Sequence, residues 1–348
     1  MGRSAIMMVF GLAVVLGYVG ISLRGSVNRL TENQYGYYQY ANARNMARLA
    51  IHRHLRFIEG INPGSGSQPA PPSSASFAGG TYTITADPTA DTLTLHSTGR
   101  YADSTYEMYV KLLLVPKPFP PSPGAIGVAA SPASLSISGQ ASVDGRNHDS
   151  TGTNLTGSGD LPGITAMNST DSAQFASSGG SYLIGNPPVA VNSSITNPAA
   201  FMNEYIQSAD SLIRTGGTIG GNRTYGSSTR PAIVVVNPDN TPGFSVKFTG
   251  NMTGYGILAV SGDVQFAGGL TWYGLVIAFG SDNTVEIFSA TGNPQIIGGV
   301  ILAGTAGAQL ALKGTGSSGG KVLYSSQALD KAKKIPQLMF YSVVEWYE

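Results

Sequence analysis

Residues 5–23 of the chain read AIMMVFGLAVVLGYVGISL. This segment has 19 residues and no charge, and Arg3 and Arg24 flank it. As an α-helix it would be roughly 28 Å long, close to the hydrocarbon thickness of a bilayer. A cleaved signal peptide has a shorter apolar core and a small-residue cleavage site, and the following SLRGSVNRL offers no such site. We therefore expect a membrane segment that is retained.

The helical pattern continues beyond the apolar segment. No proline occurs from Arg24 to Ile58, and apolar residues recur every three or four positions along one side. Gly60 and Pro63 are typical of a helix end. One continuous helix over about 5–58 is predicted, on the order of 80 Å long. Its stripe consists of Ala43, Met46, Ala47, Ala50, Ile51, Leu55 and Ile58, and Val27, Leu30, Tyr38 and Ala41 extend it backwards.

The composition restricts the function. The net charge is +1, so no global field draws the chain to nucleic acid. Only 11% of the 348 residues are charged, and 46 are glycine. Such a low share of charged residues and high share of glycine is common in secreted β-rich proteins. The absence of cysteine excludes a disulfide framework, a thiolate zinc site and a cysteine nucleophile.

Two proline-rich segments divide the rest of the chain. Residues 61–79 are rich in Pro and Ser and are predicted to be a linker or surface loop. The runs TYTITA, TLTLHSTGRY and TYEMYVKLLLVP then predict an antiparallel meander over 80–116 that packs on the amphipathic half of the helix. The second segment, PKPFPPSPG at 116–124, marks a boundary and a stiff, extended crossing.

Short apolar runs between glycines fill residues 117–348. The segments Ile257–Val260, Leu275–Ala278 and Val300–Ala303 repeat at about 18 and 25 residues, the length of one coil of a parallel β-helix. We expect such a body, with a β-sandwich as the alternative. One inserted helix is predicted at 197–215, with Asn197 as its cap. A short helix near Gln327–Lys334 and a C-terminal strand complete an α+β fold.

A helix of about fifty residues whose first half is membrane-apolar and whose second half is amphipathic resembles the α1 helix of type IV pilins. The layout of the first sixty residues is most similar to PilX-type pilins and pseudopilins, many of which also have Gly-rich C-terminal regions of this texture. Pilins of the main family carry a glutamate at the fifth mature position, where this chain has Ala5. We interpret Met1 as the mature N-terminus, which places the apolar block where a mature pilin has it.

The resemblance implies a structural subunit of an extracellular filament, inserted in the inner membrane before assembly. Its partners would be further copies of itself, the pilus assembly machinery, prepilin peptidase and possible surface glycans. The alternatives are a single-pass anchored adhesin or stalk and a β-helix carbohydrate-active enzyme. The predicted assembly residues are Ala5, Val9, Leu12, Val14, Leu16, Val19, Leu23, Tyr35, Tyr37, Tyr38 and Tyr40.

No enzymatic motif occurs in a fitting context, and no cofactor is expected. The one dense polar cluster is DGRNHD at 144–149. There Asp144, Asn147 and Asp149, with Asp160 further on, could give oxygen ligands to calcium. The interpretation we favour is a turn in which these side chains cap their own backbone.

Overall fold

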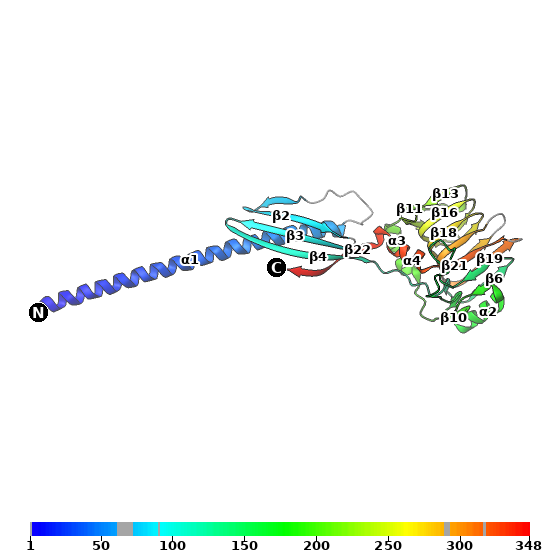
Figure 1. The fold of residues 1–348 in the computed structure, drawn as a ribbon, viewed down its shortest axis with the longest axis horizontal. Helices are drawn as coiled ribbons and strands as arrows, with labels where there is room; N and C mark the ends of the chain where they lie inside the picture. The colour runs from blue at the N-terminus through cyan, green and yellow to red at the C-terminus, as the bar shows by residue number, and fades with distance from the viewer. Residues whose placement is uncertain (1, 61–71, 90, 289–292, 316–317) are drawn as a thin grey trace. The chain divides into compact units, whose positions relative to one another are not determined.

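The computed structural model of the chain describes residues 2–60, 72–89, 91–288, 293–315 and 318–348 (Figure 1). They form two compact units. Unit 1 comprises the chain up to Val115 together with Phe340–Glu348, and unit 2 comprises Pro116–Met339. The chain therefore passes between the units twice. The predicted α+β class, with antiparallel and parallel sheets after a long helix, is confirmed.

Unit 1 is built on the long helix α1, Gly2–Gly60. A five-stranded sheet with the order β1-β2-β3-β4-β22 lies against the second half of this helix. The predicted meander is present, because β2 pairs antiparallel with β3 and β3 with β4. The strands are β1 (Ser74–Phe77), β2 (Gly80–Pro88), β3 (Thr92–Tyr101), β4 (Ser104–Pro116) and β22 (Met339–Tyr347).

Strand β1 corrects the prediction that all of 61–79 is a linker. It pairs antiparallel with β2, and Phe77 faces Gly80 across a two-residue turn. Both turn residues have positive φ, 49° at Ala78 and 81° at Gly79. Such a turn matches the twist of the flanking strands and fixes a hairpin. The remainder of the predicted linker, 61–71, lies outside the described residues.

The core of unit 1 confirms the helical stripe. Ala43, Ala47, Ala50 and Ile51 are fully buried against the sheet, and Leu55 and Ile58 pack at the edge of the same cluster. The helix and β3 approach so closely that a Cβ on Gly99 would lie 2.1 Å from the Ala43 carbonyl oxygen. The sheet contributes the buried side chains of Tyr82, Ile84, Leu93, Leu95, Met108, Val110 and Leu112.

The C-terminal strand belongs to unit 1, although the sequence placed all of 117–348 in one body. Strand β22 neighbours β4, and Lys111 of β4 lies 4.0 Å from the Glu345 carboxylate. Strand β4 is otherwise an edge, whose unpaired backbone groups are satisfied by one more strand. The strand itself was predicted, but its partner is distant in sequence.

Unit 2 is a sheet, mostly of short strands, with a few helices. Residues 117–125 contain neither helix nor strand, in keeping with the predicted crossing. Its first half contains β5 (Ile126–Ala129), β6 (Ala133–Ser138), β7 (Ser142–Asp144), β8 (Ile164–Ala166), α2 (Ser169–Gly179), η1 (Gly180–Tyr182), β9 (Leu183–Ile184), β10 (Val189–Val191), η2 (Pro198–Phe201) and α3 (Met202–Gln207). Its second half contains β11 (Ser211–Ile213), β12 (Gly217–Ile219), β13 (Arg223–Tyr225), β14 (Ala232–Val236), β15 (Ser245–Phe248), β16 (Met252–Ser261), β17 (Asp263–Ala267), β18 (Thr271–Phe288), β19 (Gln295–Thr315), β20 (Ser318–Gly319), β21 (Lys321–Tyr324), α4 (Ser326–Lys333) and η3 (Pro336–Leu338).

The strands of unit 2 pair in parallel in three stacks, and the long strands β16, β18 and β19 take part in more than one stack. The first stack has the order β11-β14-β16-β18-β19-β5-β8-β10. The second has the order β12-β15-β17-β18-β19-β6. The third has the order β13-β16-β18-β19-β21-β7-β9. The short strand β20 pairs antiparallel with β19.

Like side chains face one another along the first two stacks. In the first stack the register joins Val234, Leu258, Val276, Val300, Ile126 and Ile164, all fully buried. In the second stack the Phe248 and Phe266 rings stack with centroids 5.8 Å apart. Parallel strands buried in this way read as continuous apolar runs, which explains the runs between glycines in the sequence.

Three glycines in a row across β16, β18 and β19 form a glycine ladder, which sets the register of these strands. They lie between the part of each strand that belongs to the third stack and the part that belongs to the first. Gly256 pairs with Gly274 and Gly274 with Gly298. Their φ angles are 113°, 131° and 143°, and a Cβ on Gly274 would lie 2.1 Å from the Gly256 carbonyl oxygen. The ladder pairs Val276 with Val300, a spacing one residue shorter than the predicted repeat of about 25.

The predicted helix at 197–215 is wrong in its second half. Asn197 caps the segment as expected, its side chain accepting from the Ala199 N–H at 2.9 Å. The helical part ends at Gln207, and Ser211–Ile213 forms strand β11, parallel to β14. The Asp210 carboxylate accepts the Ile233 N–H at 2.8 Å, which ties the chain to the sheet edge. Pairing with this open edge outweighs the helical periodicity of residues 208–213.

Candidate assembly surface

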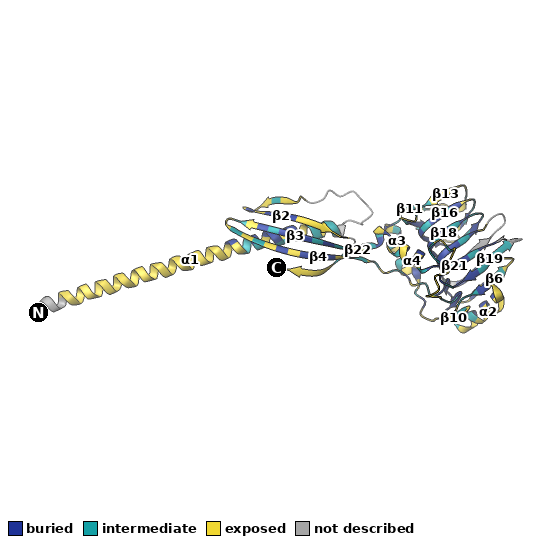
Figure 2. Cartoon of the chain, viewed as in Figure 1, coloured by how far each residue is buried: buried dark blue, intermediate teal, exposed yellow. Residues whose placement is uncertain are grey.

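No part of the chain that the structure describes covers the first half of α1. Every residue from 6 to 38 is exposed, as the yellow stretch of the helix in Figure 2 shows. This is the one helix among the described residues that is long and apolar enough to cross a membrane. The predicted assembly residues Val9, Leu12, Val14, Leu16, Val19 and Leu23 lie here, with exposed fractions between 45% and 69%. The Ala5 side chain lies outside the described residues.

Glycines interrupt this apolar surface at three places. Around Gly11, Gly17 and Gly20, apart from the neighbouring residues and backbone of the helix itself, no atom of the described residues lies within 4 Å of where a Cβ would be. Glycine costs helix stability in water but allows the backbones of two helices to approach closely in an apolar setting. The uncovered helix therefore combines large apolar side chains with positions suited to close helix contact.

The four predicted tyrosines divide into two kinds. Tyr38 and Tyr40 contact the sheet of their own chain, edge-to-face with Tyr101 at 5.9 Å and with Tyr106 at 5.3 Å. Tyr35 and Tyr37 are 60% and 75% exposed. Tyrosine gives large contact area with a polar tip, so these two side chains are suited to a contact outside the chain.

The side-chain carboxylate of Glu348 binds two arginines of α1. The sequence did not predict this contact. The Glu348 side chain accepts from Arg44 and, in a bidentate pair at 2.6 and 2.7 Å, from Nη2 of Arg48. One turn further, His52 lies against the Trp346 ring, with centroids 5.7 Å apart. The spacing of four between the two arginines could have indicated one shared partner, but nothing in the sequence indicates which carboxylate.

This ion pair makes the stability of unit 1 depend on pH. The hydrogen bonds from Arg44, and next those from Arg48, lower the pKa of Glu348 to about 2. Because the pKa is depressed on folding, the stabilisation is present above the unfolded-state pKa of about 4.3 and is lost as the pH falls toward 2.

We expect Glu348→Gln to lower the urea midpoint of unit 1 at pH 7 and to have a shrinking effect between pH 4.3 and 2. Urea titrations of both proteins at several pH values, in a Trp272→Phe background so that fluorescence reports Trp346 alone, measure this difference. Glu345→Gln is the matched control, since its carboxylate makes only the 4.0 Å contact with Lys111 among the described ion pairs. A difference between Glu348→Gln and the parent that is constant from pH 7 to pH 2 would contradict the ion pair.

The side chains that could give oxygen ligands to calcium each make their own hydrogen bonds to the protein. The Asp144 carboxylate accepts from the Arg146 N–H at 2.9 Å and from its Nη2 at 2.7 Å. Burial alone raises the pKa of Asp144, but the hydrogen bonds from Arg146 outweigh it and leave that pKa below its usual range. Asn147 donates to the Ser158 carbonyl at 2.9 Å and accepts the Ser326 N–H at 3.0 Å.

The carboxylates of Asp149 and Asp160 also accept hydrogen bonds from nearby residues. The Asp149 carboxylate accepts from Thr151, Thr153 and Asn154, and these bonds hold its pKa below its usual range. Asp160 accepts the Asn147 N–H at 2.9 Å. Within the described ranges, no group of three or more His, Cys, Asp or Glu side chains could hold a metal ion. The loop geometry is that of the capped turn.

Comparisons with known proteins add one structural likeness. No family model and no curated protein matches the chain. Among solved structures, the crystal structure of the competence-associated pilin ComZ from Thermus thermophilus is similar, at 11% sequence identity and a TM-score of 0.23. It covers 89% of this chain and 96% of that chain. A TM-score this low does not establish a shared fold, so function has to be inferred from the helix and sheets of this chain.

Proposed function

We propose that the chain is a structural subunit of an extracellular type IV pilus-like filament, which polymerises through α1. One observation carries the proposal: residues 6–38 of α1 are uncovered, whereas the stripe from Ala43 to Ile51 is buried in the chain's own sheet. An apolar helix surface of this size is stable only against lipid or other protein. Each Leu, Val, Ile, Phe or Met that becomes fully buried contributes about 1.5–3 kcal/mol.

A membrane accounts for only part of this surface. About 20 residues span a bilayer, so residues 5–23 suffice, and the exposed Leu30, Tyr35 and Tyr37 follow outside it. In a single anchored stalk, the alternative function, these side chains would remain in water. In a filament they face neighbouring copies, and this supports the subunit over the stalk.

The rest of the proposal follows from this role. The subunit resides in the inner membrane before the assembly machinery extracts it, and prepilin peptidase is its processing enzyme. Unit 2 is a parallel β-helix displayed on the outside of the filament. The parallel pairing of its three stacks supports this over a β-sandwich, whose sheets are antiparallel. The proposed role is structural and involves no catalysis.

The proposal is tested on appendages sheared from cells that produce the chain. The expected result is a filament fraction composed mainly of this chain, visible on a gel and by electron microscopy. Tyr37→Ser should reduce that fraction several-fold while leaving the melting temperature of the subunit unchanged, because Tyr37 is 75% exposed. Tyr182→Ser, at a 39% exposed tyrosine of unit 2, is the matched control. If the wild-type chain never yields a polymer, the anchored stalk is the better function.

A further inference from the structure

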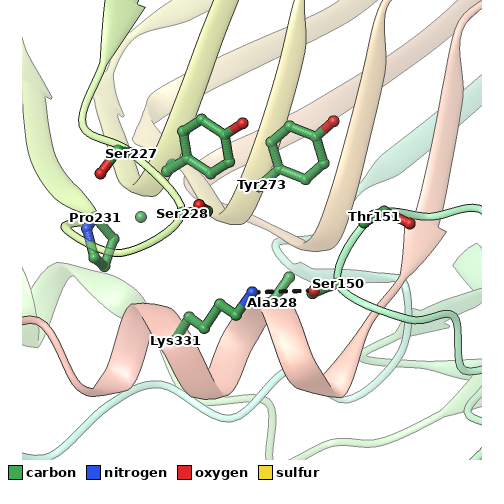
Figure 3. Close-up of a pocket in the computed structure, with 10 residues that line it drawn as sticks. Ser150, Thr151, Ser227, Ser228, Pro231, Tyr273, Ala328 and Lys331 are labelled. Carbon is green, nitrogen blue, oxygen red and sulfur yellow. Dashed lines mark hydrogen bonds between the residues drawn. The ribbon is translucent and has the colours of Figure 1, made fainter.

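Unit 2 contains a cavity of about 250 Å³ that is separate from the assembly helix. Figure 3 shows helix α4 with Ala328 and Lys331 along one side, Ser227 and Pro231 on another, and Thr151 opposite them. This volume lies just below the ~300–1,000 Å³ of sites for drug-sized ligands. It has room for one six-membered ring with its substituents.

Two tyrosines give the cavity an aromatic wall. Tyr255 of β16 and Tyr273 of β18 occupy the same register position, and their rings are nearly parallel with centroids 4.7 Å apart. The next position along the register is Ile297, which the loop at Gly152 covers. The row of aromatic rings therefore contains only Tyr255 and Tyr273 on this side, and both residues line the cavity. Burial, and then the neighbouring Tyr255, raises the pKa of Tyr273.

Hydroxyl groups and one ammonium group form the remainder of the lining. Ser150, Thr151, Ser227 and Ser228 supply hydroxyls, and Lys331 Nζ donates to Ser150 Oγ at 3.0 Å, the dashed line in Figure 3. None of the described residues that line the cavity is acidic. The lining thus offers many groups that both donate and accept, together with one positive charge.

The walls of the cavity are held in place by the chain. The Ser150 N–H donates to Gln327 Oε1 at 3.1 Å, which joins the loop to α4. Ser325, the cap of α4, donates to the Asp149 carbonyl at 3.0 Å. On the other side, the Arg230 N–H donates to Ser227 Oγ at 3.0 Å. A site fixed in this way loses little entropy when a ligand binds.

We infer that this cavity binds a carbohydrate residue that carries a carboxylate, a uronic acid of a polysaccharide. The apolar C–H groups of the sugar contact Tyr255 and Tyr273 along the side of the ring pair that lines the cavity, because each ring covers one face of the other. Its hydroxyls exchange hydrogen bonds with the serines and Thr151. The carboxylate pairs with Lys331 in a charge-assisted hydrogen bond, which is stronger than a neutral one. The inference does not depend on filament formation.

The test titrates the full chain, in a detergent without a sugar headgroup, with a glucuronic acid disaccharide and with its neutral glucose counterpart. Isothermal calorimetry should show saturable binding of the acidic disaccharide, about tenfold tighter than the neutral one. Tyr273→Ala should weaken binding at least tenfold, and Tyr273→Phe should retain most of it. Lys331→Gln should remove the preference for the acidic sugar.

Two controls separate binding from folding. Lys333→Gln changes a neighbouring lysine that pairs with Asp330 at 3.3 Å, and it should leave both affinities unchanged. The circular dichroism spectra and melting temperatures of the lysine and tyrosine variants should match those of the parent protein. Absence of saturable binding to either disaccharide would overturn the inference. Equal affinity for both sugars, or a Lys331→Gln variant that keeps the preference, would overturn the assignment of a carboxylate.

Discussion

Replacing Val14 with Arg should abolish filaments. Val14 lies near the middle of the apolar part of α1 and is 58% exposed in the single chain. In the proposed filament Val14 is buried among apolar neighbours. A guanidinium group buried there without an anionic partner would strongly destabilise the contact. Because every subunit carries the same change, the cost recurs at each contact along the polymer. We expect no filaments by electron microscopy, against normal filaments for Val14→Leu.

The charge also affects the membrane stage, so two further measurements are needed. An arginine at the centre of a bilayer costs about 2.5–3.5 kcal/mol on insertion scales, which a helix this apolar can offset. The variant should therefore still be found in the membrane fraction. Ala176→Arg, at an exposed position of helix α2 in unit 2, should still assemble. Normal filaments from Val14→Arg would show that this helix is not the filament core.

The second large effect is expected in unit 2, at the glycine ladder. Gly274→Ala places a Cβ 2.1 Å from the Gly256 carbonyl oxygen at a φ of 131°. The φ value costs about 1–3 kcal/mol for any residue with a side chain. Overpacking against backbone adds about 1–3 kcal/mol. Domains have about 5–15 kcal/mol of stability, so this single methyl group should remove a large share.

Thermal unfolding followed by circular dichroism measures this loss, and Gly220→Ala is its matched control. At Gly220 a Cβ would meet only the Thr249 hydroxyl, at 3.0 Å, which a side-chain rotation relieves. We expect Gly220→Ala to change the melting temperature little. A Gly274→Ala protein as stable as the Gly220→Ala protein would mean that the strands can shift apart, and that the ladder does not set their register.

The features predicted from the sequence are those with local periodicity. The stripe from Ala43 to Ile58 follows the helical repeat, and the meander at 80–116 follows an alternation of two. Partners distant in sequence left no such signal. For this reason β22 was assigned to the wrong unit, and residues 211–213 were assigned to a helix although they add a strand to β14.

The candidate sites show the same division. The apolar segment at 5–23 predicts a helix long enough to cross a membrane by composition alone, and the described part of α1 has that length. The cavity could not be predicted, because Tyr255, Tyr273 and Lys331 are brought together by register and by α4, and no spacing in the sequence records this. For the DGRNHD cluster the sequence favoured a capped turn over a calcium site, and the hydrogen bonds of Asp144 and Asp149 to nearby backbone N–H groups agree with such a turn.

The order of strands in the first stack has a consequence for how the protein matures. Strand β5, the first of unit 2 in sequence, pairs with β19, near the end of that unit. The segment from β5 to β10 therefore lacks its neighbour β19 until almost the whole chain has been synthesised. Pairings this distant form slowly and leave strand edges open meanwhile. The strand edges of a nascent chain of this protein should thus stay open for longer than those of a protein whose strands stack in the order of synthesis.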